Sequence, residues 1–172
     1  MMSIINENET RVTAASAEAE RIIRSSVYTA MGIGIVPIPF FNVAAVTASS
    51  LVMIRRLSEL YGVEFKEGIA KKILTSVAGA GVGVLASAPV ESAMRFVPVI
   101  GLPLTIATKP VLNGMTTYAI GRMFVTHFER GGSFVGANMD EMKSDFSSAF
   151  KNSREWLGDT IKGSEKVEIA GV

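Results

Sequence analysis

The longest uncharged stretch of this chain, the 30 residues from Ser25 to Ile54, has Pro37 and Pro39 near its centre. A single membrane-spanning helix needs about 20 apolar residues, but proline removes a backbone donor and clashes with the preceding turn. One helix is therefore expected to end near Val36. A second is expected to run from after Pro39 to Tyr61–Gly62, with glycine as its C-cap. The stretch predicts an apolar helical hairpin.

The same pattern recurs further along the chain. A third helix is expected to begin near Lys66 or Glu67 and to be apolar from Ile73 to Val90. A second proline-rich break precedes a fourth helix, which is expected to end at Gly131–Gly132. Pro110 is expected to kink this fourth helix or to split off a short segment. The residues predicted at the two hairpin tips are Pro37, Pro39, Pro98, Gly101 and Pro103.

The two ends of the chain are more polar than its centre. Residues 1–24 are predicted as a polar lead-in with a helix from about Thr13, and residues 25–135 as the helical-hairpin domain. Residues 136–162 carry an apolar stripe that indicates an amphipathic helix, and the tail 163–172 is expected to be disordered. The predicted fold class is all-α, with two proline-broken apolar helical hairpins and a C-terminal amphipathic helix. The buried anchors expected on that last helix are Phe146, Phe150 and Leu157.

The composition excludes several kinds of chemistry. The chain has no Cys and one His, so it offers no disulfide framework, no thiolate metal ligand and no multi-His zinc site. A net charge of +1 provides no general attraction to nucleic acid. Neither a Walker A motif nor a dinucleotide-binding fingerprint is present. We therefore expect no enzyme activity, no cofactor, no metal and no nucleic-acid partner.

Hydrophobic residues make up 48% of the chain and charged residues only 19%, which favours a membrane-associated protein. The 12 residues between Arg24 and Pro37 would form about 18 Å of helix, too short to cross a hydrocarbon core about 30 Å thick. The first hairpin is thus expected either to dip into a membrane or to form a buried core. Anionic lipid and the positive-inside bias would favour a one-sided basic collar near the hairpin bases. The residues predicted to form this collar are Arg24, Arg55, Arg56, Lys71, Lys72 and Arg122.

Small residues on two of the predicted helices indicate close helix packing. Gly79 and Gly83 stand four apart on one face of the third helix, a spacing that lets two helices approach closely. Thr116 and Thr117 on the fourth helix can hydrogen-bond to a neighbouring helix. These four residues are expected to serve packing within the chain or self-association, and their spacing leaves both interpretations open.

Two segments resemble a known family. One runs from Pro37-Ile-Pro-Phe-Phe-Asn into Met53-Ile-Arg-Arg-Leu-Ser-Glu-Leu-Tyr-Gly-Val; the other runs from Val97-Pro-Val-Ile-Gly through Thr117-Tyr-Ala-Ile-Gly-Arg to His127-Phe-Glu-Arg-Gly-Gly. Together they are similar to the uncharacterised bacterial domain family that includes YcjF-type inner-membrane proteins. The same domain is found at the C-terminal end of some Era-like GTPases. The resemblance covers residues 25–135 and implies a membrane-associated helical module, with a GTPase as a candidate partner and no catalytic residue.

The function that these observations favour is non-enzymatic. The chain is expected to bind membrane lipid at the cytoplasmic face of a bacterial inner membrane, and to form a homo-oligomer or recruit a partner such as a GTPase. One alternative is a soluble, cytoplasmic scaffold whose subunits bury each other's apolar hairpins. Another is a small pore or carrier with Glu91 or Lys109 in a polar path, although the proline breaks and the short first arm argue against full spans.

Overall fold

The computed structural model describes residues 2–34, 41–87 and 104–170, and the surroundings of the side chains within 13–33, 44–77 and 110–159. Every regular element in this described part is an α-helix, so the predicted all-α class is confirmed. The helices are α1 (Met2–Gly34), α2 (Phe41–Leu60), α3 (Glu67–Ser87), α5 (Leu104–Glu129) and α6 (Met139–Ala170).

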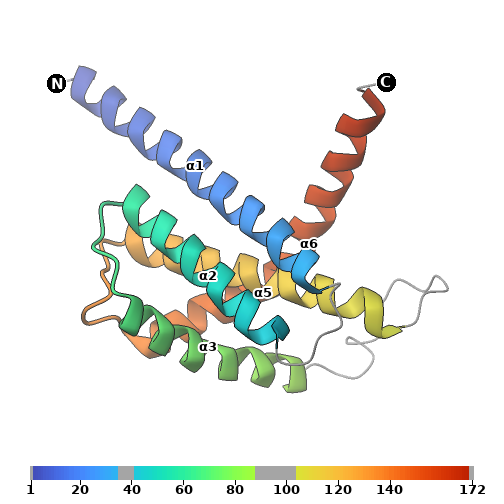
Figure 1. Cartoon of the computed structure of the whole chain (residues 1–172). Coiled ribbons are helices and arrows are strands. Elements are labelled where there is room, and N and C mark those ends of the chain that lie inside the picture. The colour runs from blue at the N-terminus through green and yellow to red at the C-terminus, as the bar shows by residue number, and fades with distance from the viewer. Residues whose placement is uncertain (1, 35–40, 88–103, 171–172) are drawn as a thin grey trace.

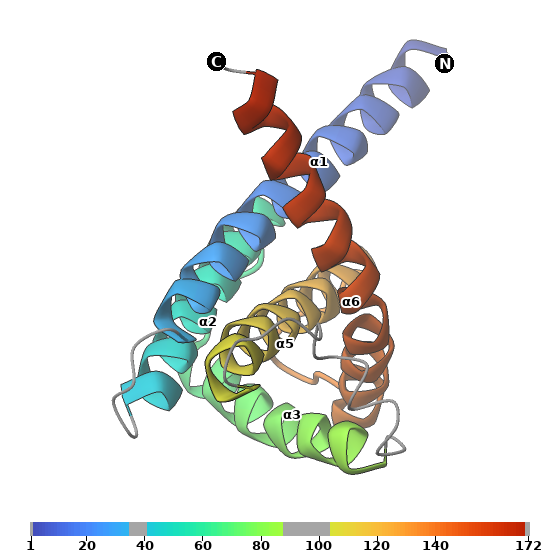
Figure 2. The same cartoon turned by 90° about the vertical axis from the view of Figure 1, so that its right-hand side faces the viewer.

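Helix α5 lies at the centre of the bundle and packs against α1, α2 and α6 (Figures 1 and 2). From Gly114 to Val125 only Thr116 and Arg122 are even partly exposed, which is the pattern of a helix covered on several sides. One hydrophobic cluster joins the helices. Its largest fully buried side chains are Ile23, Val27, Met53, Ile54, Leu57, Ile73, Val77, Met115, Met123, Phe124, Met142 and Phe146.

Glycines end α2 and α5 where the sequence predicts it. Gly62 has a φ angle of 67° and Gly131 one of 78°, the left-handed conformation that a side chain disfavours. After α5, the N–H groups of Gly131 and Gly132 donate to the carbonyls of Phe128 and His127. This pair of bonds is a Schellman motif, and the same pattern follows α2. Both helices therefore end for local reasons that are visible in the sequence.

The second predicted hairpin is arranged differently from the first. Helices α1 and α2 pack against each other as a hairpin, but in the described part α3 makes its main contacts with α6 and its next most with α2. The cause is the apolar stripe of α6, which contributes Met142, Phe146 and Phe150 to the same core as Ile73 and Val77 of α3. The amphipathic C-terminal helix thus takes the place beside α3 that was expected for α5.

Two helix boundaries differ from expectation, and Pro110 does not split off a short segment. Helix α1 begins at Met2 rather than near Thr13, since no proline or glycine interrupts residues 2–12. Helix α5 continues through Pro110, which lies in its second turn, where one intrahelical bond is lost and the flanking bonds remain. Helix α6 continues to Ala170, through residues expected to be disordered. Gly163 alone costs a helix only about 1 kcal/mol, and good helix formers follow it.

Candidate functional site

Two contacts show how α1 and α2 lie against α5. A Cβ atom built on Gly121 of α5 would lie 2.7 Å from Ile23 Cγ1 of α1 and 3.3 Å from Met53 Sδ of α2, so these three residues share one level of the bundle. Further along, Asn113 Nδ2 donates to the carbonyl oxygen of Ala30 at 3.3 Å. The beginning of α5 therefore lies beside the end of α1, and the two helices run antiparallel.

Helix α2 runs parallel to α5. Tyr61, directly after α2, donates its hydroxyl to Glu129 Oε1, at the last residue of α5, over 3.0 Å. It follows that α1 and α3 end, and α2 and α5 begin, at one end of the bundle, which we call the distal end (right-hand side of Figure 1). The opposite, proximal end holds the connections 61–66 and 130–138. Both proline-rich breaks of the sequence thus follow helix ends on the same side of the molecule.

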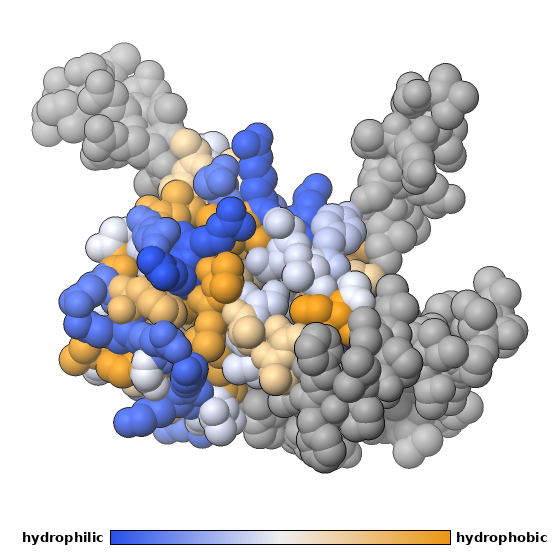
Figure 3. Space-filling model, in the orientation of Figure 1, coloured by the Kyte–Doolittle hydropathy of each residue, from blue (hydrophilic) through white to orange (hydrophobic). Residues whose placement is uncertain are grey.

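The helices carry almost no charge toward the distal end. No Asp, Glu, Lys or Arg occurs in α1 after Arg24, in α2 before Arg55 or in α3 after Lys72, and α5 holds only Lys109 before Arg122. On the described surface, strongly hydrophilic residues gather over the left and upper parts, whereas pale and orange residues adjoin the grey atoms of the right-hand end (Figure 3). Val52 of α2, one residue before Met53 and so at the edge of this part, is 60% exposed. The bundle is therefore polarised along its length.

Four of the predicted collar residues lie where the uncharged part begins. Arg24 follows Ile23, Arg122 follows Gly121, and Arg55 and Arg56 lie within one turn after Met53, so all four flank the level that Gly121 marks. Arg24, Arg55 and Arg56 are exposed, and Arg122 is half-buried. The remaining predicted members, Lys71 and Lys72, are exposed on α3, and Lys71 pairs with Glu67 at 2.7 Å.

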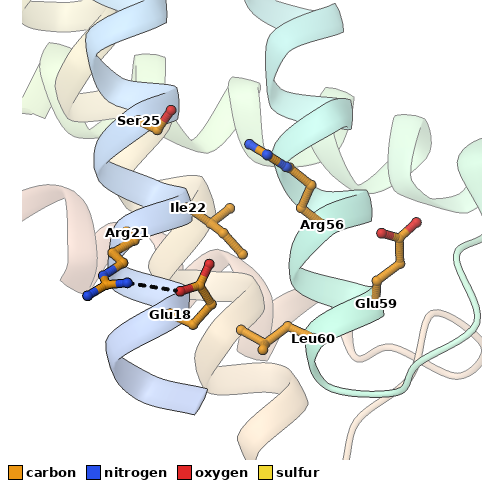
Figure 4. Close-up of a pocket in the computed structure, with 7 residues that line it drawn as sticks. All are labelled: Glu18, Arg21, Ile22, Ser25, Arg56, Glu59 and Leu60. Carbon is orange, nitrogen blue, oxygen red and sulfur yellow. Dashed lines mark ion pairs between the residues drawn. The ribbon is translucent and has the colours of Figure 1, made fainter. Parts of the chain in front are cut away.

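A cleft of about 450 Å³ opens between α1 and α2 beside this level (Figure 4). Glu18 in the cleft pairs with Arg21 at 3.7 Å, and Glu59 pairs with Arg55 at 3.0 Å. Arg56 has no ion pair within the described part of the chain, and its side chain extends between the two helices toward the side on which Ser25 lies (Figure 4). The residues that line the cleft are Glu18, Arg21, Ile22, Ser25, Arg56, Glu59 and Leu60.

Helix α6 packs along α5 and α3. Its predicted anchors are buried: Phe146 is 1% exposed, Phe150 4% and Leu157 5%. Trp156 Nε1 donates to Glu20 Oε1 of α1 at 2.6 Å, and the Trp156 ring lies 4.4 Å from the ring of Tyr118 of α5. One side chain of α6 therefore contacts both α1 and α5.

An aromatic group at the proximal end includes Tyr61, whose ring centroid is 6.0 Å from that of Phe128. Burial, the hydrogen bond to Glu129 and the charge of that carboxylate raise the pKa of Tyr61 to about 12, although Arg122 acts in the opposite direction. Burial also raises the pKa of Tyr118, again against the effect of Arg122. These hydroxyls remain protonated at neutral pH and act as fixed structural groups.

The small residues singled out in the sequence have different surroundings. Thr116 is half-buried, and Thr117 is fully buried with no partner for its hydroxyl among the described residues, as is also true of Ser50. Gly79 and Gly83 belong to α3, beyond the residues whose surroundings are described. The predicted hairpin tips, Pro37, Pro39, Pro98, Gly101 and Pro103, lie outside the described residues.

The sequence analysis did not identify Gly114 and Gly121, the glycines of α5 that allow α1 to pack closely against it. A Cβ on Gly121 would press on Ile23, and one on Gly114 would lie 3.0 Å from Met31 Cγ. These two glycines are seven residues apart, about two turns, so they lie on the same face of α5. That spacing was the available signal, and it identifies the face on which α1 rests.

In the described residues, no helix combines the length and the apolar character needed to cross a membrane.

Comparisons with known proteins identify a family and a relative of this chain. The model of a domain of unknown function, DUF697, matches residues 7–155. Magnetosome membrane protein 22 of Magnetospirillum gryphiswaldense is 40% identical over 137 residues, which cover 79% of this chain and 70% of that protein. No solved structure matches the chain. The resemblance to an uncharacterised bacterial domain family is thereby confirmed, and this chain belongs to the DUF697 family of helical domains.

Proposed function

We propose that this protein is a membrane-associated helical module that enters one leaflet of a bilayer by its distal end. The observation that carries the proposal is the polarity of the bundle: the parts of four helices that lie toward one end hold a single charged residue, Lys109, and arginines of three of these helices lie where those parts begin. An apolar end favours the hydrocarbon, and cations beside it favour the phosphates of the headgroup layer.

The dimensions of the uncharged part agree with shallow insertion. Helix α1 continues for ten residues after Arg24, through Gly34, which is about 15 Å of helix at about 1.5 Å per residue. A hydrocarbon core is about 30 Å thick, so this length reaches about the middle of the bilayer. The distal end would therefore occupy one leaflet while Arg24 stays in the headgroup layer.

The comparisons support the coarse part of this proposal. The relative from Magnetospirillum gryphiswaldense is called a magnetosome membrane protein, and it shares most of its length with this chain. The basic collar favours the cytoplasmic face of a bacterial inner membrane, because cytoplasmic segments beside apolar ones carry an excess of Lys and Arg. Protein found in the cytoplasm, free of membrane, would count against this location.

We also propose a non-enzymatic role in which the bound module self-associates or recruits a partner such as a GTPase. The support is the lack of a nucleophile–base motif in the sequence and the resemblance to domains joined to GTPases. The N-terminal part of α1 and the C-terminal part of α6 extend beyond the bundle, where a partner can reach them (Figures 1 and 2). Light scattering of the detergent-extracted protein measures self-association, and a monomeric mass would exclude the homo-oligomer.

Flotation with lipid vesicles tests the membrane proposal. Val52→Asp places a carboxylate at the exposed edge of the uncharged part of α2 and should weaken binding about tenfold, because it combines lost apolar contact with the cost of a charge near hydrocarbon. Val135→Asp is the matched control, since Val135 is 69% exposed but lies in the proximal 130–138 connection. It should leave binding unchanged.

Equal effects of the two substitutions would contradict insertion by the distal end. Wild-type protein that stays below the vesicles and forms one discrete large particle would instead favour the soluble scaffold, in which copies bury each other's distal ends. Circular dichroism should show that both variants keep the helical content of the wild type, because both positions are exposed.

A further inference from the structure

The cleft between α1 and α2 contains one cation, Arg56, that forms no ion pair with any of the described side chains. Its two carboxylates are already paired, Glu18 with Arg21 and Glu59 with Arg55. Arg56 is exposed and has no ion pair within the described part of the chain. An unpaired guanidinium in a cleft offers several N–H donors in a planar fork, the geometry that suits a phosphate.

A second donor lies across the cleft from Arg56. Ser25 stands on α1 at the distal rim, and the Arg56 side chain extends from α2 toward the same rim (Figure 4). Ile22 and Leu60 supply apolar surface between the two helices. The cleft volume of about 450 Å³ falls within the range of small-molecule sites, so a phosphate with a short organic substituent would be accommodated.

The position of the cleft indicates where such a phosphate comes from. Ser25 is the first residue of the uncharged part of α1, on the distal side of the level that Gly121 marks, and Arg56 lies within one turn of that level on the proximal side. If the distal end occupies a leaflet, this rim stands at the depth of the lipid phosphates. The local charge is slightly positive as well, because residues 18–25 and 55–60 hold four arginines against three glutamates, namely Arg21, Arg24, Arg55 and Arg56 against Glu18, Glu20 and Glu59.

We propose that this cleft is a binding site for the phosphate of an anionic lipid headgroup, held by the Arg56 guanidinium and the Ser25 hydroxyl between α1 and α2. The proposal rests on the proposed membrane association and adds lipid selectivity to it. The other collar cations attract an anionic surface without binding an individual headgroup, whereas the cleft distinguishes anionic from neutral lipid by direct contact.

Flotation with two kinds of vesicle, phosphatidylcholine alone and phosphatidylcholine mixed with phosphatidylglycerol, tests the site on the full chain. Arg24→Gln is the matched control for Arg56→Gln, because Arg24 is an exposed arginine at the same level that does not line the cleft. Removing one cation near an anionic surface should weaken binding about fivefold. Arg56→Gln should weaken binding to the mixed vesicles roughly thirtyfold, because charged hydrogen bonds are lost as well.

Another variant and two comparisons distinguish a headgroup site from general attraction to an anionic surface. Ser25→Ala should reduce the preference for phosphatidylglycerol while binding to phosphatidylcholine alone stays as in the wild type. Equal losses for Arg24→Gln and Arg56→Gln would overturn the headgroup site but leave membrane association intact. Wild-type protein that binds neither kind of vesicle would overturn the proposed function itself, and the site with it.

Soluble glycerol 3-phosphate, added at a concentration equal to that of the accessible lipid phosphate, identifies the source of the ligand. We expect it to leave vesicle binding unchanged, because the bilayer presents its phosphates at the rim and adds the apolar contact of the distal end. Displacement of the wild type to the level of Arg56→Gln would show that the cleft takes a free phosphate ester, and would overturn the assignment to lipid.

Discussion

At the residue scale, the bundle depends on a glycine at its most crowded level. Gly121 lets α5 approach both α1 and α2, since a Cβ there would come within 2.7 Å of Ile23 and 3.3 Å of Met53. Neither neighbour can move far, because both are fully buried and protein interiors are densely packed. The same residue is also next to Arg122 in the collar. The close approach of the helices therefore places the collar arginines of three helices at one level.

Gly121→Val should destabilise the protein by about 1–3 kcal/mol, the usual cost of overpacking a core. The measurement is the urea midpoint followed by circular dichroism. Gly68→Ala is the control, because a Cβ on Gly68 of α3 meets nothing within 4 Å. Alanine there should raise stability by about 0.5–1 kcal/mol through its better helix propensity. A Gly121→Val protein as stable as the wild type would contradict the close packing.

Tyr61 makes stability depend on pH in the alkaline range. Its pKa in the folded protein is about 12, against an ordinary value of 10. The protonated hydroxyl therefore contributes stability that is fully present below pH 10 and is lost as the pH rises through about 12. Between these two pH values, the free energy of unfolding of Tyr61→Phe should fall less steeply with pH than that of the wild type. If the free energy of unfolding has the same pH dependence in the two proteins, the raised pKa of Tyr61 is excluded.

At the element scale, α6 is the helix whose position was least evident from its own sequence. Its apolar stripe predicted a buried face but did not identify the surface against which that face packs. The structure places the stripe in the bundle, where it covers α5 and α3. The start of α6 is fixed locally, since Asn138 Oδ1 accepts hydrogen bonds from the backbone N–H groups of Asp140 and Glu141.

The double substitution Phe146→Asp, Phe150→Asp should release α6 from the bundle. Both rings are buried, and loss of a core phenylalanine costs about 3–5 kcal/mol before the burial of a carboxylate is counted. Limited proteolysis should then cut within α6 much faster than in the wild type. Lys151→Asp, at an exposed position of the same helix, is the control and should leave the cleavage rate unchanged. Unchanged cleavage of the double variant would contradict this docking.

At the scale of the whole molecule, the distribution of charge matters more than its total. The net charge is only +1, so the protein as a whole is barely attracted to an anionic surface. The arginines of α1, α2 and α5 nevertheless lie near one level, beside distal helix parts whose single charged residue is Lys109. A nearly neutral chain can thus present a basic collar to a membrane and its acidic groups to water.

This asymmetry predicts an opposite response to salt on two kinds of vesicle. Between about 0.1 M and about 1 M salt the screening length falls from about 10 Å to about 3 Å. Binding to vesicles that contain phosphatidylglycerol should therefore weaken strongly. Binding to phosphatidylcholine alone should stay level or increase, because apolar burial is not screened. A similar loss on both vesicles, measured by flotation, would argue that the distal end provides no apolar contact.

The sequence alone determined the features that depend on residues close together along the chain. Glycines in the left-handed conformation end α2 and α5 at Gly62 and Gly131, as predicted, because no other residue adopts that conformation so cheaply. The all-α class, the first hairpin and the apolar stripe of α6 follow equally from proline positions and helical spacing. The uncharged parts of the helices can also be read directly from the chain.

Only the tertiary structure decided which faces meet. Several apolar stripes compete for the same neighbours, and burial of apolar surface is non-directional, so spacing alone could not assign α6 to α3. The sequence drew attention to Gly79 and Gly83, whereas the structure shows Gly114 and Gly121 beneath α1. The shared level of the collar arginines and the cleft at Arg56 arise from contacts between helices distant in sequence. Such contacts are set by shape complementarity in three dimensions, which no local pattern encodes.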